Sequence, residues 1–330
     1  MAKKNSYTFP LDQKQQETLA KLLKGGNYLP IEVPHTRIAV EADHCNVMLY
    51  NSGKCLVQGK GATDWVQFNL EPLVLEEVRT GYEEALNPEL YEPHCGIDES
   101  GKGDFFGPMV IASVYADGDL AHRFNEMGVK DSKSIKNDKK ALGLASELRR
   151  LLGSRYALVT VGPRAYNRLY ASMGSVNKLL AWGHARAIED LLDSVPDCPR
   201  AVADQFGPER QIRQALMKKG RKIVLEQRPK AESDPAVAAA SILARAGFLQ
   251  ALAALEKKFG QPIPKGASAQ VREAATALVK SRGPEVLMET AKCHFRTTDQ
   301  VLEAAGSSRS DLPQEGQVTS KAERGGSSGA

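Results

Sequence analysis

Residues 96–108 read Gly96-Ile97-Asp98-Glu99-Ser100-Gly101-Lys102-Gly103-Asp104-Phe105-Phe106-Gly107-Pro108, and this stretch decides the fold. An apolar lead-in reaches two adjacent carboxylates, and a glycine-rich basic turn follows. Residues 109–115 are then apolar and β-branched, as in a buried strand. Two carboxylates at a strand end, followed by backbone that a ligand can approach closely, suit a hydrated divalent cation facing phosphate. A solvated hairpin turn with incidental acids is the alternative for this stretch alone.

The bulk composition allows a two-domain soluble protein. The chain has 330 residues, and its net charge of +4 permits a nucleic-acid partner without requiring one. The five cysteines are scattered and form no C-x-x-C pair, so we expect reduced thiols in the cytoplasm rather than a disulfide framework or zinc knuckle. No apolar run of 18 residues and no secretory h-region occur, so we expect no membrane span.

The first 85 residues predict a small α+β domain. The predicted elements are a helix at 12–23 and strands at 37–41, 45–50 and 54–59. Residues 65–70 fit either a further strand or the start of a helix. A helix laid on a curved antiparallel sheet would result, and its exposed face fits nucleic acid and ordinary solvation equally well.

The rest of the chain predicts a linker, a second domain and a tail. Residues 71–94 hold three prolines, several acids and no sustained period, and we place the linker between domains at 86–93. The second domain then spans 94–305 and alternates strands with helices, which predicts an α/β fold with a mixed sheet. Residues 306–330 are rich in serine, glycine and charge, so we expect a disordered tail.

Further carboxylates stand at the ends of predicted elements. A short apolar strand ends abruptly at Asp204, which repeats the design at Asp98. Asp234-Pro235 is a strong helix start, with aspartate as N-cap and proline at the first position, so Asp234 has a structural role. Glu232 lies just outside that helix and is the better candidate ligand, with Asp234 as the alternate.

Several polar side chains are candidates for substrate contact. Lys130, Ser132 and Lys133 form a compact set of donors that fits phosphate oxygens, although a helix cap explains the same loop. Asn177 starts a long helix and fits either a backbone bond or a substrate sugar. For His184 on that helix, a surface or satisfied core histidine is favoured. Basic residues cluster near the end of the domain at Lys292, His294 and Arg296.

Together these residues predict a metal-dependent phosphodiesterase. No Walker loop, G-x-G-x-x-G motif or convincing Ser/His or Cys/His arrangement competes. Hard oxygen ligands suit Mg²⁺ or Mn²⁺, and two such ions can activate water and stabilise a leaving oxygen.

The opening stretch resembles the signature of the type 2 ribonucleases H, and of ribonuclease HIII among them. Later motifs of that family are similar to Val129-Lys130-Asp131-Ser132-Lys133, Asp204-Gln205-Phe206 and Lys230-Ala231-Glu232 with the following Ala-Ala-Ala-Ser-Ile helix. The resemblance covers about residues 94–300. The N-terminal unit looks like the extra domain of ribonuclease HIII, which is similar to TATA-binding protein. Ribonuclease HII lacks that domain and carries Gly-Arg-Gly where this chain has Gly101-Lys102-Gly103.

The resemblance implies a ribonuclease H fold and cleavage of the RNA strand of RNA/DNA hybrids, leaving 5′-phosphate and 3′-hydroxyl ends. Asp98, Glu99, Asp204 and a fourth acid would hold two Mg²⁺ or Mn²⁺ ions. The fourth acid is Glu232, with Asp234 as the alternate, and Glu232 would depart from the commonest family set, which has aspartate in fourth place. Ser100 and the Gly101–Gly103 amides would contact the scissile phosphate or a 2′-hydroxyl.

Two rival readings stay open on the sequence. The first is a non-catalytic nucleic-acid-binding protein whose carboxylates are structural. The second is a nuclease or resolvase of the same fold class that acts on DNA junctions. We expect a monomer.

Overall fold

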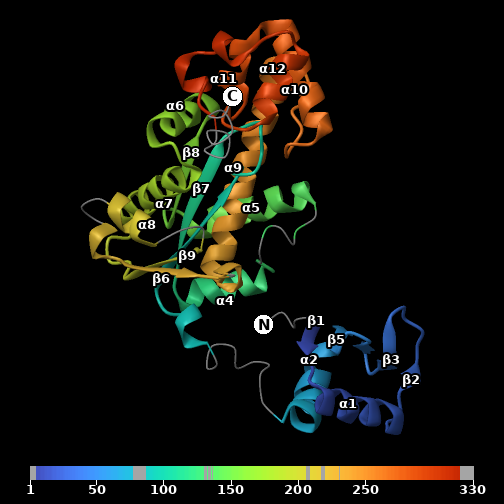
Figure 1. Cartoon of the computed structure of the whole chain (residues 1–330). Helices are drawn as coiled ribbons and strands as arrows, with labels where there is room; N and C mark the ends of the chain where they lie inside the picture. Colours follow the sequence, from blue (N-terminus) through green and yellow to red (C-terminus); the bar gives the residue numbers. More distant parts are fainter. Residues whose placement is uncertain are drawn as a thin grey trace, which may run out of the picture. The chain divides into compact units, whose positions relative to one another are not determined.

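The computed structural model divides the chain into two compact units, Met1–Glu89 and Leu90–Ala330, each of which is considered by itself (Figure 1). The structure describes residues 5–76, 87–129, 132, 135, 137–205, 209–216, 220–229 and 231–319. The boundary falls inside the predicted linker region.

The first unit is a five-stranded antiparallel sheet of order β1-β5-β4-β3-β2 with helices on one side. Its elements are β1 Ser6–Pro10, α1 Gln13–Gly25, β2 Leu29–Pro30, β3 Thr36–Ala42, β4 Cys45–Tyr50, β5 Lys54–Gly59, α2 Ala62–Trp65 and the π-helix η1 Val66–Leu75. A capping box between Asp12 and Gln15 starts α1. Val47 and Val57 from neighbouring strands are fully buried beneath Leu19 of that helix. The predicted small α+β domain is confirmed.

The residues following β5 correct two expectations. Residues 65–70, left open between strand and helix, are helical. Residues 71–75 are not a linker, because they continue this helix and bury Glu71, Val74 and Leu75 in the first unit. The buried residues Val66, Leu70 and Val74 recur at helical spacing, but Pro72 lies between them and proline usually breaks a helix, so the sequence indicated a linker here. Residues 77–86 lie outside the described part.

The second unit is built on a five-stranded mixed sheet of order β10-β9-β6-β7-β8. Its strands are β6 His94–Ser100, β7 Met109–Ala116, β8 Tyr156–Val161, β9 Arg200–Asp204 and β10 Val224–Arg228. The strands β6, β7 and β8 pair antiparallel, whereas β9 and β10 run parallel to β6. Ile97 of β6 is in register with Ala203 of β9, so the next residue of each strand, Asp98 and Asp204, emerges at the same edge.

Helices cover both faces of this sheet (Figure 1). The helices of this unit are α4 Gly118–Glu126, α5 Asp138–Leu152, α6 Pro163–Met173, α7 Val176–Leu192, α8 Glu209–Ala215, α9 Pro235–Phe259, α10 Ala269–Arg282, α11 Leu287–Thr290 and α12 Thr297–Ala304. Its short 3₁₀ turns are η4 Gly220–Lys222, η5 Ala231–Ser233, η6 Pro284–Val286, η7 Arg309–Asp311 and η8 Gln314–Gly316, and a further turn, η2 Pro88–Leu90, spans the boundary between the units. One face packs on α9 with α4 and α5, and the other on α7 with α6 and α8.

The long helix α9 is the centre of the core. Its alanines let its backbone lie directly on β6: a Cβ at Gly96 would stand 2.1 Å from the Val237 nitrogen. By length and apolar composition α9 meets the criteria for a membrane span, but 67% of that segment is buried inside the unit. The α/β fold with a mixed sheet that the sequence predicts is therefore confirmed, with α9 as its core helix.

The predicted disordered tail is wrong for residues 306–319. This segment folds back over the second unit, and Leu312 packs into the core with 3% exposure. Arg309 fixes it there by pairing with Asp299 and donating to the carbonyl oxygen of Cys293 at 2.8 Å. One apolar residue and one long-range arginine network order a segment whose composition predicts disorder. Residues 320–330 lie outside the described part.

Candidate active site

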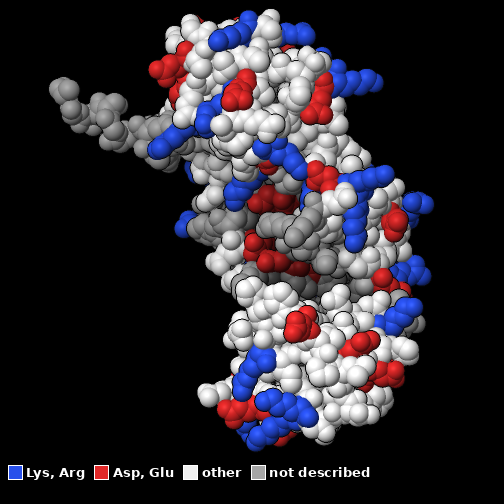
Figure 2. Space-filling model, turned by 90° about the vertical axis from the view of Figure 1, so that its right-hand side faces the viewer, with Lys and Arg blue, Asp and Glu red and all other residues white. Residues whose placement is uncertain are grey.

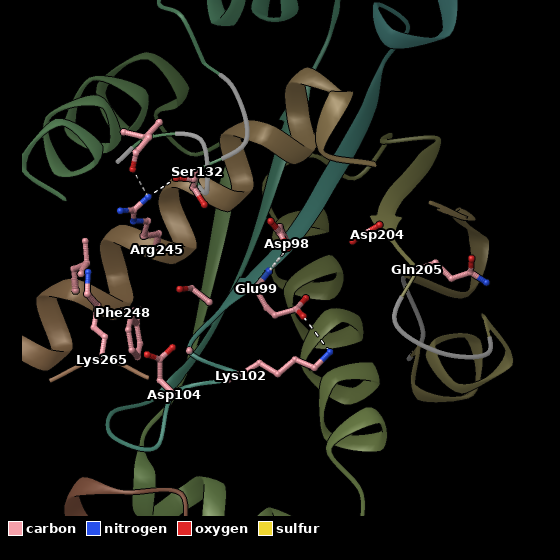
Figure 3. A pocket seen from close by; sticks show the side chains of 15 residues that line it. Asp98, Glu99, Lys102, Asp104, Ser132, Asp204, Gln205, Arg245, Phe248 and Lys265 are labelled. Atoms are coloured by element: carbon pink, nitrogen blue, oxygen red, sulfur yellow. Dashed lines mark hydrogen bonds and ion pairs between the residues drawn. The ribbon is translucent and has the colours of Figure 1, made fainter. Parts of the chain in front are cut away.

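A pocket of about 730 Å³ opens where β6 and β9 end. Asp98 and Glu99 reach it from β6 and Asp204 from β9, and all three are half-buried (Figure 3). The residues lining it are Asp98, Glu99, Ser100, Gly101, Lys102, Gly103, Asp104, Ser132, Ile135, Asp204, Gln205, Arg245, Phe248, Leu249 and Lys265. Figure 2 shows acidic side chains in a hollow of the surface, with lysine and arginine side chains near its rim. The structure thus brings three predicted acids into one open pocket.

The Glu99 carboxylate is held from two sides. His184 of α7 lies with Nε2 3.1 Å from Glu99 Oε2, and Lys102 lies with Nζ 3.7 Å from Oε1. The His184 side chain is 1% exposed, whereas that of Glu99 is 15% exposed. The neighbouring Asp98 accepts a hydrogen bond at Oδ1 from the backbone N–H of Glu99, 2.8 Å away. These contacts orient the carboxylates toward the pocket before any ligand arrives.

The donor set of this pocket suits a hard cation. Carboxylate oxygens from Asp98, Glu99 and Asp204 are the ligands that Mg²⁺ and Mn²⁺ prefer. In the described ranges, no three His, Cys, Asp or Glu side chains already stand together as a metal-binding group. The fit therefore rests on the chemistry of the oxygens and on their common pocket.

The glycine turn brings the backbone to the same pocket. Gly101 has φ +87°, and a Cβ there would stand 2.3 Å from the carbonyl oxygen of Pro108. Only glycine fits that close return of the chain. A Cβ at Gly103 would meet nothing within 4 Å, and Gly103 is exposed. Ser100 and Lys102 line the pocket beside them, so the predicted substrate loop borders the acids.

The loop that contains Ser132 reaches the pocket from the other side. The backbone N–H of Ser132 donates to Ser241 Oγ at 3.0 Å, and the carbonyl oxygen of Ser132 accepts a hydrogen bond from Arg245. Asp138 ties Arg245 and Lys265 together, each at 2.6 Å. Burial alone would raise the pKa of Asp138, but these two cations lower it below its usual value. Lys130 and Lys133, the other predicted donors of this loop, lie outside the described residues.

The two candidates for the fourth acid differ in their surroundings. Asp234 is buried, and its Oδ1 accepts from the N–H groups of Ala236 and Val237 and lies 3.0 Å from His94 Nε2. Burial alone would lower the pKa of His94, but the hydrogen bond and charge of Asp234 raise it. Glu232 lies half-buried on η5, between β10 and α9, and is not among the residues that line the pocket. The capping role predicted for Asp234 is confirmed.

Other predicted residues lie elsewhere. Asn177 is exposed on the first turn of α7 and does not line the pocket. The predicted basic cluster near the end of the domain is wrong for Lys292 and His294, because both are buried in the core. His184, expected at the surface or as an ordinary core residue, instead contacts Glu99. Its position between Leu180 and Ile188, four residues away on each side, marked it as core-facing. No local pattern marked Arg245, Phe248 and Lys265 as lining residues.

The chain is similar to known ribonucleases. A family model described as ribonuclease HII matches residues 95–298. Ribonuclease HIII of Protochlamydia amoebophila is 40% identical over 297 residues, 90% of this chain and 96% of that protein. Ribonuclease HIII of Chlamydia pneumoniae is 38% identical over 298 residues, 89% of this chain and 97% of that protein.

Solved structures agree. Bst ribonuclease HIII in complex with Mn²⁺ is 30% identical with a TM-score of 0.62, over 91% of this chain and 99% of that one. Ribonuclease H2 of Pyrococcus horikoshii shares the fold at 22% identity, with a TM-score of 0.54 over 65% of this chain and 99% of that one. The resemblance drawn from the opening stretch is confirmed: the chain belongs to the type 2 ribonuclease H family, on the ribonuclease HIII branch, and is an endoribonuclease.

Proposed function

We propose that this chain hydrolyses the RNA strand of RNA/DNA hybrids with two divalent cations, leaving 5′-phosphate and 3′-hydroxyl ends. The observation that carries the proposal is the meeting of Asp98, Glu99 and Asp204 with the glycine turn in one open pocket. Carboxylates that can bind a cation lie there beside backbone that a phosphodiester can approach closely. The ribonuclease HIII relatives support the substrate class.

Asp98, Glu99, Asp204 and Glu232 would hold the cations. When bound, Mg²⁺ or Mn²⁺ supplies activation of water and stabilisation of the leaving oxygen. The Mn²⁺ complex of Bst ribonuclease HIII supports a divalent ion in this family. Glu232 rather than Asp234 completes the set, because Asp234 already serves the helix start and His94.

The remaining pocket residues orient the acids and the substrate. His184 orients the Glu99 carboxylate, because the Nε2 atom of its buried ring lies 3.1 Å from Glu99 Oε2. Lys102 lies within reach of both Glu99 and an incoming phosphate, and so balances negative charge on this wall. The glycine turn presents backbone at the pocket edge, where N–H groups of Gly101 to Gly103 can bond a phosphate oxygen or 2′-hydroxyl. That contact would select RNA over DNA at the cleaved position.

The N-terminal unit would bind the hybrid through the sheet face that its helices leave uncovered. On β5, Cys55 and Val57 point into the core, so Lys54 and Gln58 face the opposite side, and both are exposed. Exposed polar side chains with a lysine among them suit the phosphate backbone of a duplex without reading its sequence.

The reaction is tested with labelled RNA/DNA hybrid, duplex DNA, duplex RNA and a DNA four-way junction, each with Mg²⁺, Mn²⁺ or chelator. We expect cuts only in the RNA strand of the hybrid, with 5′-phosphate ends, and none with chelator. Junction or duplex DNA cleavage would favour the resolvase reading. Binding of the hybrid without cleavage under any metal would favour the non-catalytic one.

The role of the N-terminal sheet is tested in the full chain with Lys54→Glu/Gln58→Glu. We expect a KM for the hybrid raised by about 10-fold with kcat unchanged, because phosphate contacts contribute to binding rather than to the chemical step. The control is Lys21→Glu, which changes an exposed lysine on α1 over the other sheet face, and the single variant Lys54→Glu gives the comparison with the same change in charge. Equal effects of the two changes would reject the assignment.

A further inference from the structure

The side chain of Lys292 places an amino group inside the core of the second unit. Its side chain is fully buried, and its Nζ lies 5.8 Å from the centre of the Tyr166 ring. Within the described part of the chain, no carboxylate lies within ion-pair distance of it. Burial lowers the pKa of Lys292 to about 7, and the charge of Asp104 opposes that shift. A buried lysine in such a place costs free energy that an apolar residue of similar size would not.

Three main-chain carbonyl oxygens surround this ammonium. Nζ donates to the oxygens of Asp104 at 2.7 Å, Phe106 at 3.1 Å and Gly107 at 2.8 Å. The three acceptors match the three N–H bonds of an ammonium group. All three belong to the second half of the loop that begins with the glycine turn.

Backbone bonds attach the same loop half to the segment that contains Lys292. The Lys292 N–H donates to the carbonyl oxygen of Phe105, and the Gly107 N–H to that of Thr290, both at 2.8 Å. Phe106 and Ala291 form an isolated β-bridge. The side chain of Lys292 therefore completes an attachment that the backbone begins.

This attachment reaches the pocket directly. Asp104 lines the pocket, while its carbonyl oxygen is bonded to Lys292 from the core side. Its N–H also donates to the carbonyl oxygen of Gly101 at 3.3 Å. Gly101 in turn packs against the carbonyl of Pro108, where the loop closes. A shift of the Asp104–Gly107 carbonyls would move the glycine backbone that faces the substrate.

We propose that Lys292 is a positioning residue for the substrate-facing glycine turn: its ammonium holds the returning half of the loop, and thereby sets where the Gly101–Gly103 backbone meets the scissile phosphate. The inference rests on the proposed function, because that function gives the turn its substrate. Lys292 itself touches no substrate. An apolar residue would fill the same space but leave three carbonyl oxygens without their donor.

The test compares Lys292→Met and Lys292→Gln with wild type on a labelled hybrid at 25 °C. Methionine keeps the volume and removes every donor, whereas glutamine restores two N–H donors without charge. We expect kcat to fall by about 100-fold in Lys292→Met, since a misplacement of about 1 Å can have that effect. Lys292→Gln should lose about 10-fold, because part of the hydrogen bonding is restored. KM should change by less than about threefold in both, because the hybrid is bound largely elsewhere.

A matched control separates positioning from loss of stability. Leu278→Ala on α10 removes a core side chain of the same unit, 1% exposed, and lies outside the pocket lining. We expect it to lower the melting temperature while leaving kcat near wild type. The comparison uses Lys292→Met, or Lys292→Gln if the methionine variant does not fold. If that variant loses no more kcat than Leu278→Ala does, the proposal is wrong.

Amide hydrogen exchange measures how firmly the loop is held, and it needs no substrate. Amides of residues 101–107 should exchange about 10-fold faster in the Lys292 variant than in Leu278→Ala, because the loop opens locally. Equal exchange in the two variants would overturn the proposal, whatever the activity. A wild-type protein that leaves the hybrid intact with either metal would instead refute the proposed function, and the exchange measurement would still decide the role of Lys292.

Discussion

The two ends of β6 carry the same chemical pair in opposite settings. At its start, His94 lies 3.0 Å from Asp234, with side-chain exposures of 0% and 2%. At its other end, His184 lies 3.1 Å from Glu99, with exposures of 1% and 15%. Each pair joins a buried histidine to a carboxylate. Glu99 lines the pocket, whereas Asp234 is not among its lining residues.

The difference separates an acid that is occupied by structural hydrogen bonds from an acid that is open to a ligand. At the closed end, Asp234 Oδ1 serves two backbone N–H groups and His94, which fastens α9 to the first residue of β6. At the open end, the histidine stands behind Glu99 and leaves the carboxylate turned to the pocket with Asp98 and Asp204 (Figure 3). Burial and partners, rather than residue type, therefore decide which acid can serve a ligand.

The largest expected contrast lies between the two neighbouring acids Glu232 and Asp234. We expect Glu232→Gln to reduce hybrid cleavage by about 10³-fold or more, because a ligand oxygen is lost, while the melting temperature stays near wild type. Asp234→Asn should retain cleavage at 25 °C and lose about 1–3 kcal/mol of stability, because a bond to a charged group is removed. Cleavage rates and thermal unfolding of both variants make the test. The reverse pattern would make Asp234 the fourth ligand.

A smaller effect is expected behind the open carboxylate. His184→Gln should lower kcat by about 10–100-fold, because partners that orient a metal-holding carboxylate typically contribute that much. The variant should need more Mn²⁺ for half-maximal activity than wild type does. The control is His122→Gln, a histidine on α4 outside the pocket lining. A metal requirement unchanged from wild type would show that His184 serves packing alone.

The smallest effect concerns pH at the closed end. The pKa of His94 is raised in the folded protein, so the folded state binds this proton more tightly than the unfolded chain. The resulting stabilisation is fully present below pH 6.5 and is lost as pH rises through the folded pKa. The difference in unfolding free energy between wild type and His94→Gln should therefore be larger at pH 6 than at pH 8.5. Denaturant titrations at the two pH values measure it, and a constant difference would speak against a charged pair.

Local patterns predicted the elements that carry the acids. Asp98 and Asp204 each end an apolar strand, and the register of β6 with β9 places them together. The helix start at Asp234-Pro235 was predictable for a similar reason, because the capping interactions join residues that are close in sequence.

Side chains that act across long sequence separations were beyond prediction. His184 meets Glu99 from 85 residues away, and Lys292 meets Asp104 from 188 residues away. Neither spacing leaves a periodic trace, and a buried lysine contradicts the usual preference of that residue for solvent. Arg309 is a similar case, since its partners Asp299 and Cys293 lie before the segment whose composition indicates disorder.

The most direct test of the open end as the catalytic site is Asp98→Asn measured for both binding and cleavage of one labelled hybrid in Mn²⁺. Asparagine keeps the shape of Asp98 but removes the negative charge that is proposed to hold a cation. The account predicts hybrid binding within about threefold of wild type and cleavage slower by about 10³-fold or more. Cleavage at the wild-type rate by Asp98→Asn would contradict it.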